Sequence, residues 1–182
     1  MSSRPEHSRN GYDRSVTAAR TRAIEIVRRA GVDHRVHAYH SPERHGRARD
    51  ARPDFGLAAA AALGIEPDRI YKTLVATVDD RLVLAVVPVA GAMDPKGLAD
   101  ACGGRRAELT EPAVAERATG YVIGGISPLG SRRPLPVVLD AGSAAHSTIF
   151  VSAGRRGLQL ELAPSDLARL SRAIIAPIAR DY

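Results

Sequence analysis

The sequence predicts an α+β domain with a mixed, largely antiparallel and partly closed sheet surrounded by short helices. The clearest sign is an apolar hairpin, in which segments 69–78 and 82–89 flank the polar triplet Asp79-Asp80-Arg81. Short strand patterns and short helix patterns follow one another along the rest of the chain. Because 45% of the residues are hydrophobic but only 4% are aromatic, the core must be aliphatic.

The part of the chain before the hairpin predicts two helices and one strand. An apolar stripe over residues 16–30 predicts a helix that ends at Gly31, and alternation over 34–39 predicts a strand. Residues 41–54 hold two prolines and many charges, which is typical of a long loop. A short Ala-rich helix is expected over 55–63.

The part after the hairpin predicts three helices and three strands, each bounded by Gly, Pro or a capping residue. The expected helices are 95–101 capped by Asp94, 112–119 capped by Thr110, and 164–173, and the expected strands are 135–140, 147–152 and 158–162. Residues 120–130 form a glycine-rich turn region between the second of these helices and the first of these strands.

Length and composition favour one cytoplasmic domain. Of the 182 residues, we expect 1–15 to form a polar tail and 16–182 a single domain. The longest apolar run, residues 57–65, is about half as long as a membrane span, and no secretory signal opens the chain. Cys102 is the single cysteine and cannot form an internal disulfide, which favours a reducing compartment.

The positive charge is concentrated at the front of the chain. There are 26 basic and 20 acidic residues, a net charge of +6, and residues 1–56 supply +5 of it with 12 Arg against 7 acidic residues. A basic segment favours polyanions, of which nucleic acid is the commonest. For residues 1–15 a solvated leader is the simpler interpretation, because they show no apolar periodicity.

Two features are candidates for chemistry. Lys72 lies inside an apolar strand, and since an unpaired buried ammonium is costly, it should reach a cavity, a phosphate or a carbonyl. An outward-facing strand position is the simpler alternative. Gly124 and Gly125 open the segment Gly-Gly-Ile-Ser-Pro-Leu-Gly and would bring backbone N–H groups close to an anion or oxyanion. A tight turn is the alternative here.

Three turns each carry two arginines beside a small residue: Arg105-Arg106, Arg132-Arg133 and Arg155-Arg156. If these turns share one mouth of the domain, the pairs would hold phosphates, whereas any single pair is ordinary solvated surface. Other arrangements form no site. The spacing of His34, His37 and His40 points neighbours to opposite strand faces, so neither a metal nor a cofactor is expected. Cys102, Ser127 and Ser152 lack the context of a nucleophile.

Five segments, in this order, resemble the YbaK family, which is related to the editing domain inserted in bacterial prolyl-tRNA synthetases. They are Tyr71-Lys72-Thr73-Leu74, 88–91, 119–130, 149–152 and 156–158. The resemblance implies a mixed, partly barrel-like sheet and a free-standing enzyme that hydrolyses the ester of a mischarged tRNA. Cys-tRNA(Pro) is the first expected substrate and Ala-tRNA(Pro) the second, with prolyl-tRNA synthetase as a candidate partner.

The resemblance also implies a set of site residues. Lys72 matches the family's essential lysine, and Gly124 matches the first glycine of its Gly-Gly-Ile-Ser-Pro motif. The expected substrate-binding residues are Tyr39, Thr73, Ser127, Ser152 and Gln159, with Gly125 beside Gly124 and with Arg132, Arg133, Arg155 and Arg156 on tRNA phosphates. In the cysteine-specific branch, the substrate's own thiol is implied to attack its ester.

One position departs from the family pattern in a way that bears on the pocket. Gln159 stands where members often carry an aspartate, and His146 replaces a phenylalanine. A lost carboxylate changes the charge of the pocket and leaves the aminoacyl specificity open. It also keeps two alternatives open: a non-catalytic module that binds the tRNA 3′ end or a nucleotide, and a factor that acts only when docked on a synthetase.

Overall fold

The described part of the chain consists of short strands and short helices. The computed structural model describes residues 19–40 and 54–182. The strands are β1 (His34–Ala38), β2 (Ile70–Val78), β3 (Arg81–Pro88), β4 (Ala92–Met93), β5 (Ala107–Leu109), β6 (Val137–Asp140), β7 (Ile149–Ser152), β8 (Leu158–Leu162), β9 (Ile174–Ala176) and β10 (Ala179–Arg180). The helices are α2 (Arg22–Ala30), α3 (Phe55–Leu63), α4 (Pro95–Ala101), α5 (Pro112–Thr119) and α6 (Pro164–Ser171), with 3-10 turns η1 (Pro67–Arg69) and η2 (Ala141–Ala145).

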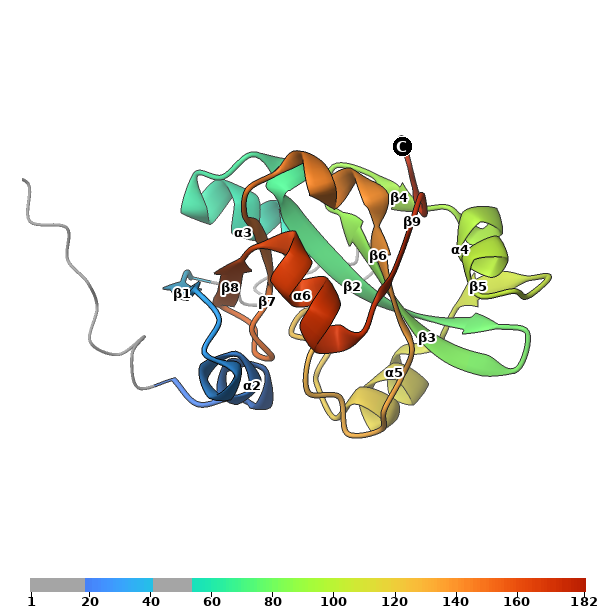
Figure 1. Ribbon diagram of the computed structural model, residues 1–182, viewed down its shortest axis with the longest axis horizontal. Helices are drawn as coiled ribbons and strands as arrows, with labels where there is room; N and C mark the ends of the chain where they lie inside the picture. The colour runs from blue at the N-terminus through green and yellow to red at the C-terminus, as the bar shows by residue number, and fades with distance from the viewer. Residues whose placement is uncertain (1–18, 41–53) are drawn as a thin grey trace, which may run out of the picture.

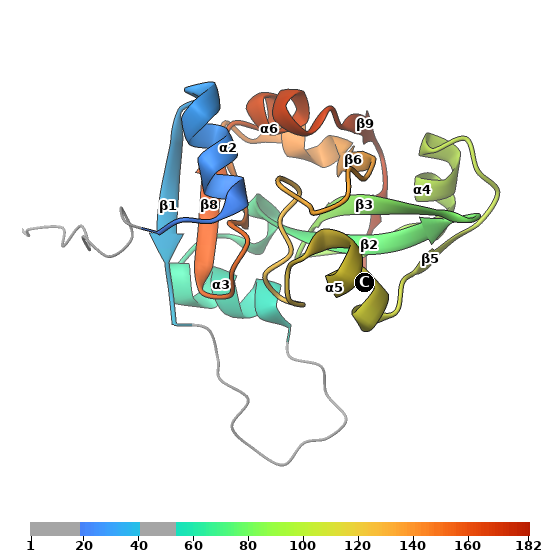
Figure 2. The same cartoon turned by 90° about the horizontal axis from the view of Figure 1, so that it is seen from below.

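A mixed sheet runs through the centre of the molecule. Its strands follow the order β1-β8-β7-β2-β3-β6-β9, and β5 adds to the β7 side of β2. Neighbours pair antiparallel except β2 with β7, β3 with β6 and β6 with β9. Figure 2 shows β1 and β8 lying crosswise to β2 and β3, so the sheet is strongly twisted. The predicted α+β class and mixed, largely antiparallel sheet are confirmed.

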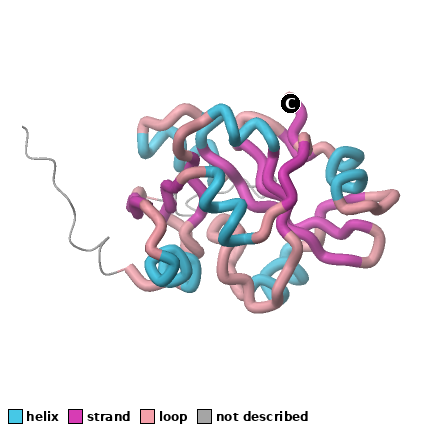
Figure 3. The backbone as a smooth tube through the Cα atoms, in the orientation of Figure 1, coloured by secondary structure: helices cyan, strands magenta, loops and turns pink. Residues whose placement is uncertain are grey.

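Helices cover both faces of the sheet, and each face has its own apolar core (Figures 1 and 3). The larger core packs α2 and α6 against one face, with Ile24, Leu139 and Leu160 among its fully buried side chains. On the other face, α4 packs over β3 and β6, and α3 packs over Phe150 of β7. The alternation of β2 therefore sends Tyr71 and Ile70 into different cores.

Local signals explain most element boundaries. Gly31 and Gly64 end α2 and α3 in the left-handed conformation, and the Asp54 and Asp94 side chains accept hydrogen bonds from the first turns of α3 and α4. The predicted hairpin is present, with Asp79 at a φ of 50° in its turn. No helix of the described residues is long and apolar enough to cross a membrane.

Two expectations need correction, and two others fall outside the described residues. The first helix begins at Arg22, six residues later than predicted, because the Thr21 side chain accepts from the Ile24 N–H and caps it there. Thr110 does not cap α5: its hydroxyl bonds that of Thr77 instead, 3.1 Å away. The expected tail of residues 1–15 and nearly all of the charged loop lie outside the described residues.

Candidate functional site

One edge of β2 has two different strand partners with a gap between them. β7 pairs with Ile70 and Tyr71, and β5 pairs with residues 76–78, so residues 72–75 have no strand partner on that edge. A cleft of about 600 Å³ opens at this gap. It is lined by Asp54, Phe55, Gly56, residues 70–75, Leu109, Thr110, Pro112, Ala115, Glu116, Ile123, Gly124, Ile126, Ser152, Arg156 and Gln159.

Lys72 provides an ammonium group at the cleft. The alternation of β2 places it on the same face as Ile70, the face that α3 covers. Its Nζ donates a hydrogen bond of 2.5 Å to the Tyr182 hydroxyl, an exposed group. Lys72 is only partly buried and forms no ion pair with the described residues, so a ligand in the cleft can reach its ammonium.

Two buried polar atoms of the cleft lack a hydrogen-bond partner. They are the Thr73 hydroxyl oxygen and the Gln159 side-chain carbonyl oxygen, and only Ser131 Oγ shares this state among the described residues. Gln159 is 5% exposed. An unsatisfied buried polar group costs about 1–3 kcal/mol, so these two oxygens are available to hydrogen-bond water or a ligand in the cleft.

Gly124 lines the cleft at a point where the Phe55 ring leaves no room for a side chain. Its φ of +83° is the left-handed region that favours glycine, and a Cβ there would lie 2.6 Å from the Phe55 ring. The Phe55 ring is covered in turn by the Arg156 guanidinium, 4.8 Å from the ring centroid. Arg156 also donates from Nε to the Ile123 carbonyl at 2.7 Å, which ties the β7–β8 turn to the glycine segment.

The structure brings together most, but not all, of the predicted substrate-binding residues. Ser152 lines the cleft with Thr73 and Gln159, and its hydroxyl accepts from the Gly154 N–H at 3.3 Å. Tyr39 does not line the cleft and packs against the core under α3. Ser127 is fully buried, and its hydroxyl accepts from the Leu129 N–H.

The predicted glycines and arginine pairs are likewise divided between the surroundings of the cleft and other parts of the fold. Gly125 packs on the backbone of the β7–β8 turn, where its Cβ would lie 3.0 Å from the Arg156 nitrogen. Arg132-Arg133 and Arg155-Arg156 both contact the segment 118–125, through Arg132 N to Thr119 O and the Arg156 bond to Ile123. Arg105-Arg106 lies elsewhere, because the backbone N–H groups of both residues donate to Asp79 in the β2–β3 turn.

Some residues of the site were not predicted from the sequence. Phe55 follows the cap of α3 and forms the roof of the cleft, and Glu116 accepts from the Ile123 N–H at 2.8 Å and lines its wall. Tyr182 reaches Lys72 from the far end of the described chain. Neither a histidine nor a cysteine is among the lining residues. Cys102 lies at the end of α4, where burial raises the pKa of its thiol.

The described part of the chain contains no candidate metal site. Residues 19–40 and 54–182 contain no group of three or more His, Cys, Asp or Glu side chains placed to hold an ion. The cleft itself contains two cations, Lys72 and Arg156, and two carboxylates, Asp54 and Glu116. Its chemistry is therefore electrostatic and hydrogen-bonding, through fixed charges and the two unsatisfied polar atoms.

Residues 57–170 match the model of a family described as the aminoacyl-tRNA editing domain. Over 164 residues the chain is 36% identical to "Putative Cys-tRNA(Pro)/Cys-tRNA(Cys) deacylase EbsC" of Enterococcus faecalis (strain ATCC 700802 / V583), covering 89% of this chain and 94% of that protein. The fold is similar to that of two crystal structures. One is of a hypothetical protein (TM-score 0.75, 21% identity, 88% of this chain and 100% of the other). The other is of "a putative trans-editing enzyme for prolyl tRNA synthetase" (TM-score 0.71, 22% identity, 89% and 99%).

Proposed function

Since the chain belongs to the aminoacyl-tRNA editing domain family, whose members cleave mischarged tRNA, we propose that it is a free-standing deacylase that removes cysteine from Cys-tRNA(Pro). The observation that carries this proposal is the cleft at the gap in β2. Lys72 and the two residues with unsatisfied polar oxygens, Thr73 and Gln159, line one space of about 600 Å³. A small aminoacyl ester offers a carbonyl oxygen to the Lys72 ammonium and an amino group to the unsatisfied oxygens.

Each group has a part in the proposed reaction. The Lys72 ammonium stabilises the negative charge that develops on the ester carbonyl oxygen. The Gln159 carbonyl oxygen accepts a hydrogen bond from the substrate's α-amino group, and the Thr73 hydroxyl satisfies a further polar atom of the ester. Gln159 is neutral, so it recognises the amino group by a hydrogen bond and not by an ion pair.

The nucleophile in this proposal comes from the substrate or from water. None of the threonine and serine hydroxyls of the cleft is hydrogen-bonded to a base: that of Thr73 has no partner, that of Ser152 accepts from the Gly154 N–H, and that of Thr110 bonds the Thr77 hydroxyl. With a cysteinyl ester, the substrate thiolate attacks the carbonyl carbon: a C–S bond forms, the C–O bond to the ribose breaks, and the ribose oxygen takes a proton. With Ala-tRNA(Pro), the second candidate substrate, water must attack instead, and the products are alanine and free tRNA.

The decisive experiment compares the two lysines of the chain, Lys72 and Lys96. Lys96 lies in the first turn of α4 and is not among the cleft residues, so Lys96→Ala is a matched control. We expect Lys72→Ala to lower deacylation of Cys-tRNA(Pro) by about 100-fold or more, as loss of one oxyanion-stabilising group does, with an unchanged circular dichroism spectrum. Wild-type rates in Lys72→Ala would refute the site. A wild type that binds this tRNA but deacylates neither Cys-tRNA(Pro) nor Ala-tRNA(Pro) would favour the binding module.

We propose that Arg132, Arg133, Arg155 and Arg156 contact tRNA phosphates, because both pairs flank the glycine segment at the cleft. Arg133→Ala and Arg105→Ala form a matched pair of exposed arginines in similar turns, of which only the first lies near this segment. We expect Arg133→Ala to weaken tRNA affinity and reduce its salt dependence, while Arg105→Ala leaves both unchanged. Equal effects of the two substitutions would contradict this placement.

Prolyl-tRNA synthetase is the proposed partner, because a domain of this size has little surface with which to select its own tRNA. We expect addition of the synthetase to stimulate deacylation of Cys-tRNA(Pro) at limiting tRNA. The measurement is the initial rate with and without the synthetase, with an unrelated synthetase as the control. No stimulation would indicate an autonomous enzyme.

A further inference from the structure

Tyr182 is an exposed aromatic side chain that is hydrogen-bonded to Lys72, the lysine of the cleft. Its hydroxyl accepts the hydrogen bond from Lys72 Nζ at 2.5 Å, and the residue is 76% exposed. None of the other large hydrophobic side chains that are exposed in residues 19–40 and 54–182 is aromatic. Lys72 Nζ also lies over the ring, 4.9 Å from its centroid, so this largely exposed ring is in contact with the cation to which we assign the ester carbonyl.

The chain segment that carries Tyr182 is firmly held. Asp140, at the end of β6, accepts hydrogen bonds of 2.9 Å from the backbone N–H groups of both Ile178 and Ala179. Ile178 is fully buried in the core under α4, and β10 pairs with β4 immediately afterwards. Figure 1 shows this segment emerging beside β4. Tyr182 is thus presented two residues beyond a fixed strand.

We propose that the Tyr182 ring is the stacking platform for the terminal nucleobase of the tRNA, a contact that rests on the proposed function. An exposed π-face next to a cation is the arrangement on which proteins stack single-stranded bases. In an aminoacyl-tRNA, the base is joined to the ester through one ribose. A substrate with its carbonyl at Lys72 therefore places its base near the Tyr182 ring, which the Lys72 bond already holds at the mouth of the cleft.

The position of the ring favours a nucleobase over a protein partner. Tyr182 follows Arg180 and Asp181, two charged residues that line a smaller neighbouring cleft of about 270 Å³. A single exposed ring beside charged residues suits one planar group of a polyanion. Because every base has a π-face, the platform would select for a nucleotide next to the ester and not for a particular base.

The kinetic test separates the ring from the hydroxyl. Tyr182→Phe keeps the ring and its contact with the Lys72 ammonium but loses the hydrogen bonds of the hydroxyl to Lys72 and Val89, and Tyr182→Leu loses all of these contacts. We expect Tyr182→Leu to raise KM for Cys-tRNA(Pro) about tenfold, the size of one lost stacked base, and Tyr182→Phe to leave KM within about twofold. Hydrolysis of cysteine ethyl ester, which has no base, should be equal in the two variants. Ile175→Ala, at an exposed residue of β9 outside the cleft, is the control. Equal KM values for Tyr182→Leu and wild type would overturn the proposal, as would an equal rise in both Tyr182 variants.

A binding measurement makes the test independent of turnover. The chain has no tryptophan, so Tyr182→Trp introduces a single indole and Ile175→Trp a matched control. We expect the trinucleotide cytidyl-cytidyl-adenosine to quench the first and leave the second unchanged. Absence of quenching at Trp in position 182, in a wild type that deacylates Cys-tRNA(Pro), would overturn the platform while leaving the proposed function intact. Quenching in a protein without deacylase activity would support the platform and refute the enzyme.

Discussion

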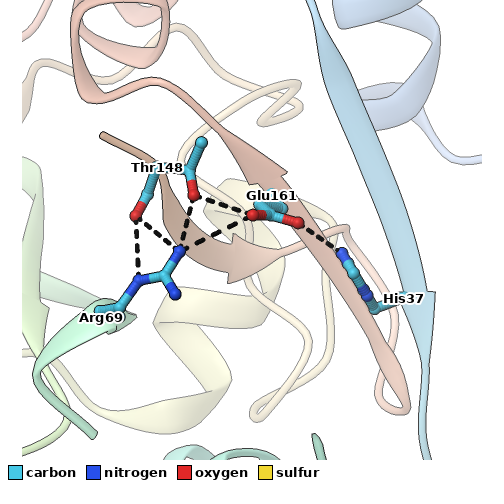
Figure 4. Close-up of polar contacts among 4 residues, drawn as sticks. All are labelled: His37, Arg69, Thr148 and Glu161. Carbon is cyan, nitrogen blue, oxygen red and sulfur yellow. Dashed lines mark hydrogen bonds and ion pairs between the residues drawn. The ribbon is translucent and has the colours of Figure 1, made fainter. Parts of the chain in front are cut away.

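Gln159 and Glu161 lie two residues apart on the same face of β8 and have opposite hydrogen-bonding states. The Glu161 carboxylate bonds His37 Nε2 at 2.8 Å and accepts from the Thr148 hydroxyl, also at 2.8 Å, while Arg69 donates to that hydroxyl at 2.7 Å (Figure 4). The Gln159 carbonyl oxygen is buried and has no partner.

The difference between Gln159 and Glu161 distinguishes polar side chains that stabilise the fold from polar side chains that are available to a ligand. Both carboxylate oxygens of Glu161 have partners within the protein, so the cluster joins β8 to β1, to η1 and to Thr148 just before β7 without a ligand. Around Gln159 the protein itself leaves polar atoms without partners, so they are available to water or to a ligand in the cleft. Changes near Glu161 should therefore affect stability, and changes in the cleft should affect turnover.

The largest effect on turnover after that of Lys72 should come from Gly124→Ala. A Cβ at this position would lie 2.6 Å from the Phe55 ring, so the roof must move. We expect deacylation of Cys-tRNA(Pro) to fall about 100-fold, because small misplacements in a site are costly. Gly103→Ala has a similar positive φ of +65° but no atom within 4 Å of the new Cβ, so it reports the backbone strain alone. Equal losses of activity in the two variants would contradict the role of the roof.

Glu161→Gln should give the largest loss of stability with little change in turnover. It removes charge-assisted hydrogen bonds from a mostly buried side chain, and we expect the free energy of unfolding at pH 7 to fall by about 2 kcal/mol. Urea denaturation measures this, and deacylation should stay within about twofold of wild type. A variant of wild-type stability but low activity would place Glu161 in the site instead.

The same carboxylate should make the stability depend on pH in the acid range. Burial by itself raises the pKa of Glu161, but hydrogen bonds from Thr148 and His37 and the charges of His37 and Arg35 outweigh it and hold the pKa below its usual 4.5. A lowered pKa in the folded state means that the stabilisation is present above pH 4.5 and is lost as the pH falls through the folded value. The difference in unfolding free energy between wild type and Glu161→Gln should shrink over that window. A constant difference would show that the carboxylate is not responsible.

Substitutions of Thr73 and Thr148 should have smaller effects and test the same contrast between the cleft and the Glu161 cluster. Thr73→Val removes a hydroxyl that has no partner, and Thr148→Val removes one that bonds Glu161 and Arg69. We expect the first to leave the unfolding free energy unchanged or to raise it by up to about 1 kcal/mol and to slow deacylation several-fold. The second should lower the unfolding free energy by about 1 kcal/mol and leave deacylation unchanged. The reverse pattern would contradict the distinction drawn between the two regions.

The smallest effect should come from Cys102, which lies in neither region. Its thiol lies at the end of α4, and burial raises its pKa, so little thiolate forms at neutral pH. We expect Cys102→Ser to deacylate Cys-tRNA(Pro) within about twofold of wild type, and the native thiol to react slowly with iodoacetamide. A large loss of activity would require a thiol nucleophile that the cleft does not show.

The parts of the fold that sequence reasoning predicted are those with local causes. The β2–β3 hairpin depends on a turn and its flanking residues, and the start of α4 on the Asp94 cap, so both were predictable. β9 and β10 were not, because they are two or three residues long and are defined by distant partners. Tyr182 reaches Lys72 only because Asp140 holds the backbone 38 residues later in the chain, which no short motif reveals.

Several residues of the candidate site were predictable from the sequence, but the cleft that they line was not. Lys72 and Gly124 stood out because a lysine within an apolar strand and a pair of glycines each need a physical reason. The cleft itself arises because β7 and β5 leave the edge of β2 at different points, and such a gap is a property of strand pairing, not of any residue. Phe55 was missed because its place at the cleft likewise depends on how distant segments pack together and not on a local motif.

The position of β8 between β1 and β7 has a consequence for how the protein is made. His34 pairs with Leu162, so the first strand emerges from the ribosome long before its partner has been synthesised. A nascent chain that ends before residue 158 has no β8, and therefore neither the Gln159 wall of the cleft nor a partner for β1. The candidate site is then assembled only after β8 has been synthesised, and pairing between strands so far apart in the sequence makes folding slow.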